Sequence, residues 1–140
     1  MGRRGRALAC LCLLVAVTGC ASHHASAGGT PAALVKQAFV DVFSSKTPVA
    51  LRESALENGM AFAPALTAQA KAGAMTPTIG AVTFSDSSHA AVSFSLTVAS
   101  ATHLPSIAGA AVLVGSSWQV SASTMCVVLS ATNQHAAACG

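Results

Sequence analysis

The hydrophobic and polar positions of this chain follow two different periods. Between residues 31 and 43, apolar side chains recur at spacings of three and four, the pattern of a helix with one buried face. The Thr30–Pro31 pair precedes this stripe as an N-cap residue followed by proline at the first helical position. We therefore predict a helix from residue 31. Its buried stripe consists of Leu34, Val35, Ala38, Phe39, Val42 and Phe43.

Two shorter helices are predicted next. The Thr47–Pro48 pair repeats the N-terminal signal, and Asn58–Gly59 supplies the left-handed stop that ends a helix near Glu57. A third helix, only weakly amphipathic, is expected from Pro64 to Ala72, with Gly73 just beyond its end.

After this helix the period changes to alternation. A strand is predicted over residues 78–84, and the Ser and Asp residues at 85–88 predict a turn. Residues 89–99 then alternate between apolar and small polar side chains, so one face is buried and the other exposed. The inward-facing set is Ala90, Val92, Phe94, Leu96 and Val98.

Two further strands complete the predicted sheet. Residues 102–106, interrupted by Pro105, are expected to be a connection to a third strand over 109–114. After a turn at 115–117, a fourth strand is predicted from Trp118 to about Leu129. Helices followed by an antiparallel meander indicate an α+β fold, in which the helices pack on one face of a four-stranded antiparallel sheet.

The N-terminal segment has the features of a bacterial lipoprotein signal. Arg3, Arg4 and Arg6 form a basic start, and residues 7–17 form an apolar core. Eleven residues span only about 16 Å as a helix, roughly half of a bilayer's hydrocarbon core, so this core is too short to cross a membrane. The sequence Val-Thr-Gly-Cys at 17–20 matches the lipobox, the signature at which lipoprotein precursors are modified and cut.

We therefore expect Cys20 to carry a diacylglycerol thioether, with fatty-acyl chains such as palmitate, which anchors the protein to the extracytoplasmic face of the cell membrane. Release of a fraction of the protein is the alternative. The expected organisation is a signal peptide at 1–19, a lipidated and flexible tether at 20–30, and one domain at 31–140. The Arg3–Arg4 pair is similar to a twin-arginine signal, but its surroundings favour the general secretory route.

Charge is scarce in the expected mature chain. The formal net charge of +3 comes entirely from the arginines before Cys20, and after it four cations balance four carboxylates. The sequence contains no Tyr and a single Trp. A neutral chain with few aromatic side chains lacks both the phosphate-neutralising and the base-stacking groups of a nucleic-acid-binding protein, so we expect no nucleic-acid partner.

Cys126 and Cys139 are the two cysteines that remain besides the anchor. An even pair outside the cytoplasm favours a disulfide, which would tie the C-terminal tail to the fourth strand. The alternative is a metal site that includes His135, but the spacing contains no C-x-x-C step and no fourth ligand lies nearby. We expect no metal.

Several of these residues resemble those of the mycobacterial low-molecular-weight antigen family of small secreted or lipid-anchored proteins. The resembling stretches are Leu-Glu-Asn-Gly at 56–59, the apolar hairpin at 111–120, and Thr-Met-Cys at 124–126, with Cys139 closing the match. The hairpin has Ser116–Ser117 where the family usually has a charged turn. The resemblance implies a cone-like fold similar to nuclear transport factor 2 or cystatin, and a protein with no established enzymatic role.

Two Asp–His pairs are the candidates for acid–base chemistry. Asp86 and His89 flank the predicted turn at 85–88, where Asp usually bonds its own backbone. Asp41 and His103 are the second pair. A general base needs a neighbour and an enclosed pocket to tune its pKa, and the sequence indicates neither for these residues. We expect no catalytic residue and no cofactor.

The sequence therefore predicts a non-catalytic lipoprotein that acts as a binding or interaction module. Its partner would be a small apolar ligand held inside the cone or another envelope protein docked on the serine-rich sheet face. An envelope enzyme with a pocket Asp–His pair and a structural spacer are the alternatives. The residues expected to line a ligand pocket are Phe39, Phe62, Phe94 and Trp118.

Overall fold

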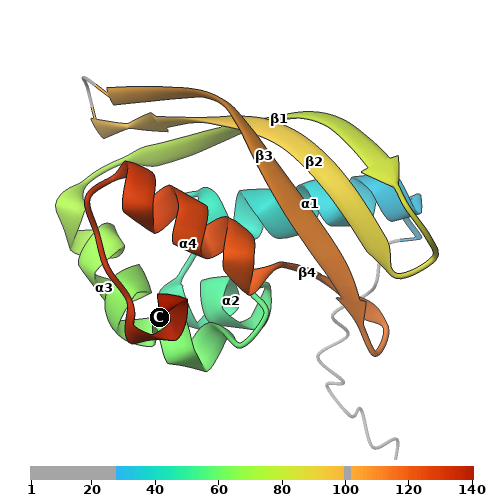
Figure 1. Ribbon diagram of the computed structural model, residues 1–140, viewed down its shortest axis with the longest axis horizontal. Helices are drawn as coiled ribbons and strands as arrows, with labels where there is room; N and C mark the ends of the chain where they lie inside the picture. Colours follow the sequence, from blue (N-terminus) through green and yellow to red (C-terminus); the bar gives the residue numbers. More distant parts are fainter. Residues whose placement is uncertain (1–27, 100–101) are drawn as a thin grey trace, which may run out of the picture.

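The computed structural model describes residues 28–99 and 102–140. The predicted signal peptide, Cys20 and most of the tether lie outside these residues. None of the described helices is both long and apolar enough to cross a membrane. The described elements, in chain order, are α1 Pro31–Phe43, α2 Val49–Ser54, η1 Gly59–Phe62, α3 Ala63–Ala72, β1 Met75–Phe84, β2 His89–Val98, β3 Thr102–Val114, β4 Ser117–Val120, α4 Ala122–Ala131 and η3 Ala137–Cys139 (Figure 1).

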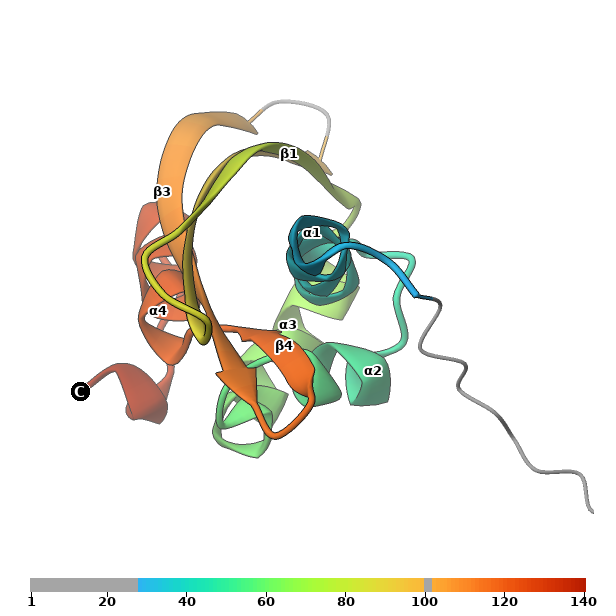
Figure 2. The same ribbon diagram turned by 90° about the vertical axis from the view of Figure 1, so that its right-hand side faces the viewer.

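The sheet is antiparallel, with the strand order β1-β2-β3-β4. It curls into an arc, α1 lies across its concave side, and none of the described helices covers the convex side of β1 and β2 (Figure 2). The predicted α+β class, with helices on one face of a curved four-stranded antiparallel sheet, is confirmed.

The core lies between α1 and the concave face. The α1 stripe is buried as predicted, except that Leu34 is 37% exposed. Phe39 and Phe43 of α1 contact Phe94 of β2, with ring centroids 5.0 and 5.2 Å from Phe94. Gly109 faces the same cluster: a Cβ atom there would lie 2.8 Å from Phe94 and 2.9 Å from Phe39. The core is therefore packed closely enough to require a glycine at this position.

Several helices and strands form where local sequence patterns predict them. The Thr30 hydroxyl accepts a hydrogen bond from the backbone N–H of Ala33, and proline occupies the first turn of α1. Strand β2 buries the predicted inward set from Ala90 to Leu96, while Val98 is half-buried. The turn at 85–88 forms where it was predicted.

The predicted connection at 102–106 is wrong, because β3 starts at Thr102 and continues through Pro105. The pairing of β2 with β3 shifts between Phe94 and Leu96, so Pro105 lies at a bulge, where a missing backbone N–H breaks no regular ladder. Strand β4 pairs only with residues 111–114 of β3, so this part of β3 also has no β4 neighbour.

The predicted fourth strand is also wrong beyond Val120. The Ser121 hydroxyl accepts a hydrogen bond from the backbone N–H of Thr124 and caps a new helix, α4. Met125, Val128 and Leu129 recur at helical spacing and are buried in the core. The run of β-branched residues that favoured a strand therefore belongs to a helix.

Helix α2 begins one residue later than predicted, with Pro48 as its N-cap, and ends at Ser54 rather than near Glu57. The next residues leave the helix to pair with β4. The backbone N–H of Glu57 donates to Val120 O at 2.9 Å, and the N–H of Val120 donates to Ala55 O at 2.9 Å. This short parallel bridge covers part of the outer edge of β4.

Candidate functional site

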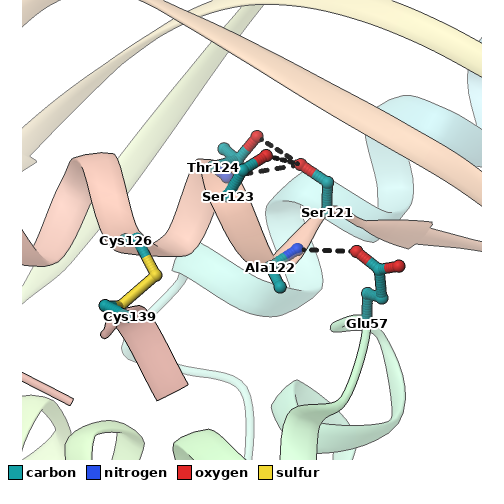
Figure 3. Close-up of a disulfide and its surroundings, with 7 residues drawn as sticks. All are labelled: Glu57, Ser121, Ala122, Ser123, Thr124, Cys126 and Cys139. Atoms are coloured by element: carbon teal, nitrogen blue, oxygen red, sulfur yellow. Dashed lines mark hydrogen bonds between the residues drawn. A yellow bond between two sulfur atoms is a disulfide. The ribbon is translucent and has the colours of Figure 1, made fainter. Parts of the chain in front are cut away.

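The predicted disulfide forms, and Figure 3 shows its surroundings. Cys126 projects from α4 and Cys139 from η3, with their Cα atoms 5.5 Å apart. The disulfide ties the C-terminal segment to a helix, and the expectation that it would tie it to a strand is wrong. No group of three His, Cys, Asp or Glu side chains within the described residues could hold a metal ion.

The start of α4 is held by side chains from two parts of the chain (Figure 3). The Glu57 carboxylate accepts a hydrogen bond from the backbone N–H of Ala122 at 2.9 Å. Ser121 caps the same turn, and its hydroxyl lies 2.8 Å from the Thr124 hydroxyl. A carboxylate at a helix N-terminus compensates both the free N–H groups and the positive end of the helix dipole. Glu57 therefore has a structural role here.

The four aromatic residues expected around a ligand pocket lie in different surroundings. Phe39 and Phe94 pack against each other, and Phe62 is fully buried in the same core cluster. Trp118 lies on β4, half-buried, and its ring packs edge-on against Phe84 with centroids 5.5 Å apart. The structure brings Phe39 and Phe94 together within the core, and it gives Trp118 a different aromatic neighbour.

The two candidate Asp–His pairs differ in geometry. His89 Nδ1 lies 3.0 Å from the Asp86 carboxylate, but the two side chains are 59% and 53% exposed. Three hydrogen bonds to the Asp86 carboxylate lower the pKa of this group from 3.8 to about 2. The largest effect comes from the backbone N–H of Ser88, and smaller effects come from His89 and then the Ser88 hydroxyl. An exposed carboxylate held in its charged form is a poor general base.

Asp41 and His103 have separate partners. The Asp41 carboxylate accepts a hydrogen bond from Gln37, one turn earlier on α1, at 2.7 Å. His103 Nδ1 lies 3.5 Å from the Thr97 hydroxyl on the neighbouring strand. Each residue therefore has its own nearby hydrogen-bond partner: Asp41 has one on α1, and His103 of β3 has one on β2.

Arg52, which the sequence pattern does not single out as a site residue, is 1% exposed. Its guanidinium donates to Val42 O at 2.6 Å, to Leu66 O at 3.4 Å and to Gln69 Oε1 at 2.6 Å. No carboxylate among the described residues forms an ion pair with it. Desolvation lowers the pKa of Arg52 below its ordinary value. The only indication of this buried guanidinium in the sequence is that Arg52 is one of the few charged residues after Cys20.

The convex face of the sheet carries no helix among the described residues (Figure 2). We define it by the small, uncharged outward-facing residues along the middle of β1, β2 and β3: Thr78, Thr83, Ala91, Ser93, Ser95 and Ala108. His89 and His103 lie on the same face, toward the ends of their strands. Two shallow hollows of about 300 and 260 Å³ lie on it, and Ser93 and Ser106 border both.

Comparison with known proteins places the chain in a family. A search among curated proteins gives no significant match. The family model described as the C-terminal domain of the low molecular weight antigen MTB12 matches residues 29–136, which covers nearly all of the described domain. On that match, the chain belongs to the family of the low molecular weight antigen MTB12 C-terminal domain.

Proposed function

We propose that this protein is a cell-envelope lipoprotein whose domain is a non-catalytic interaction module for another envelope protein. Cys20 would carry the lipid, and the domain would stand on the extracytoplasmic face of the membrane. The lipobox at 17–20 and the family's antigen description support this proposal.

The length of the tether sets how far the domain stands from the bilayer. Ten residues, 21–30, separate Cys20 from α1. Whatever conformation they adopt, ten residues span at most about 35 Å. The domain would therefore stay close to the membrane and meet partners that are membrane-bound themselves.

A single observation carries the proposed interaction role: the described helices leave the convex face uncovered, and the residues along its middle are uncharged. Depletion of charged residues is what distinguishes the centre of a protein interface from the rest of a surface. Ser93, Ser95 and Ala108 also have little side-chain entropy to lose when a partner covers them. Since Phe39, Phe43 and Phe94 fill the space under the sheet, a partner would bind outside the cone rather than within it.

Site-specific photocrosslinking in cells that make the full-length protein tests this role. A crosslinking amino acid at Ser93 or Ala108 should give the same discrete adduct with one envelope protein. The matched control is Thr67, an exposed residue of α3. Ser93→Arg should remove the Ala108 adduct because it places a charge at the centre of the contact. Adducts of equal yield from Thr67, or none from the convex face, would contradict the proposal, and the latter would favour a spacer.

A further inference from the structure

A cavity lies away from the convex face, where α3, β1 and the end of α4 converge (Figure 1). Its volume is about 210 Å³. Part of its wall is apolar, formed by Met75 and Val98. Two glutamines, Gln69 on α3 and Gln134 after α4, also line it.

Gln69 presents a hydrogen-bond donor that no other described residue uses. The residue is 6% exposed, and its Oε1 accepts from the Arg52 guanidinium at 2.6 Å. Arginine can only donate, so this contact fixes which end of the amide faces Arg52. The other end, Nε2, is buried and has no hydrogen-bond partner among the described residues. Its orientation is therefore set before any ligand arrives.

Gln134 presents the complementary acceptor. Its Oε1 is buried and likewise unpaired within the described part of the chain. Its backbone is fixed, because its N–H donates to Leu129 O at 2.8 Å while Asn133 adopts a left-handed conformation, with φ 53°. This arrangement is a Schellman motif, which closes the C-terminus of α4 and holds Gln134 in the cavity wall.

Each unpaired buried polar atom costs about 1–3 kcal/mol relative to one that is hydrogen bonded. A ligand that satisfies both glutamines would remove that cost at two atoms together. The buried charge of Arg52 also polarises the Gln69 amide through their hydrogen bond, which makes Nε2 a stronger donor.

From this juxtaposition we infer that the cavity binds a small molecule with an amide-like group. Its carbonyl oxygen would accept from Gln69 Nε2, and its adjacent N–H or O–H would donate to Gln134 Oε1. Its apolar body would contact Met75 and Val98. The volume is below the roughly 300–1,000 Å³ of pockets for drug-sized ligands, so the class is that of small lactams, primary amides and short carboxylic acids.

Titration of the ¹⁵N-labelled protein with 2-pyrrolidinone tests the inference, because glutamine side-chain amides give their own NMR signals. We expect saturable shifts of the Gln69 and Gln134 amide signals. N-methyl-2-pyrrolidinone has the same ring and carbonyl but no donor, and it should bind at least about tenfold more weakly, the loss expected for about 1.4 kcal/mol.

Two variants separate ligand binding from folding. Gln69→Glu keeps an acceptor for Arg52, removes the Nε2 donor and adds a carboxylate that the Arg52 guanidinium can neutralise, so the protein should fold and lose at least about tenfold in affinity. Gln134→Met removes the acceptor and should have a similar effect. The inference is wrong if the N-methyl compound binds equally well, if Gln69→Glu folds and binds like the parent protein, or if 2-pyrrolidinone produces no saturable shift at either glutamine.

Discussion

Arg52 and Glu57 are two of the eight charged side chains that follow Cys20, and each holds distant segments together. Arg52 joins the end of α1 to α3, since its acceptors are Val42 O, Leu66 O and Gln69. Val42 O lies in the last turn of α1, where carbonyl groups lack helical partners and the dipole favours a cation. In a protein with so few charges, these two stabilise tertiary structure rather than cover the surface.

Replacing Glu57 with Ala should destabilise the domain by about 1 kcal/mol, since α4 loses the acceptor for its Ala122 N–H and the favourable charge at its N-terminus. Urea denaturation of the purified domain measures the change. Glu53→Ala is the matched control, because it removes the same charge close by without touching α4. Equal losses for the two variants would show that charge, not the cap, determines the effect.

Asp86 should make the stability of the β1–β2 turn depend on pH. Its folded-state pKa of about 2 lies below the ordinary 3.8, so it stabilises the fold above about pH 4, and this contribution is lost as the pH falls to about 2. Asp86→Asn should lower the melting temperature at neutral pH, and the difference from the parent protein should vanish near pH 2. Ser87→Ala is the control. A difference that stays constant across this range would refute the assignment.

At the scale of elements, sequence patterns succeeded where the deciding interaction was local. The Thr30 cap and the apolar stripe placed α1, and strict alternation placed β2. The same reasoning failed for α4, because Val127 and Val128 favour a strand and the deciding cap at Ser121 is a single residue. It also missed the cavity, since Gln69 and Gln134 meet only through the tertiary fold.

The disulfide should contribute about 3 kcal/mol to the stability of the domain, given the 13-residue separation of its cysteines. The double variant Cys126→Ser, Cys139→Ser should therefore unfold at lower urea concentration, and η3 should lose its attachment to α4. Amide hydrogen exchange should become faster after residue 134. In β2, the exchange rates should change only as much as the global free energy of unfolding requires. If the exchange rates of the tail remain the same, other contacts hold it.

At the scale of the whole molecule, the curved sheet separates three environments. The concave side is filled by the hydrophobic core, the convex face is lined along its middle by small, uncharged side chains, and the 210 Å³ cavity lies where α3 and the end of α4 meet. Interaction with a partner and binding of a small ligand are therefore assigned to different surfaces, and variants of one should leave the other intact. The likeness to nuclear transport factor 2 or cystatin stays a prediction.

The proposed anchor is what would bring these surfaces to the membrane, and intact-mass spectrometry of the protein extracted from its own membranes tests it most directly. We expect a chain that begins at Cys20, with a mass above that of residues 20–140 by a diacylglycerol group and, where the amine is acylated, one further fatty acid. Cys20→Ser should yield an uncleaved precursor without lipid. An unmodified mature chain, or a variant that matures and remains in the membrane like the parent, would contradict it.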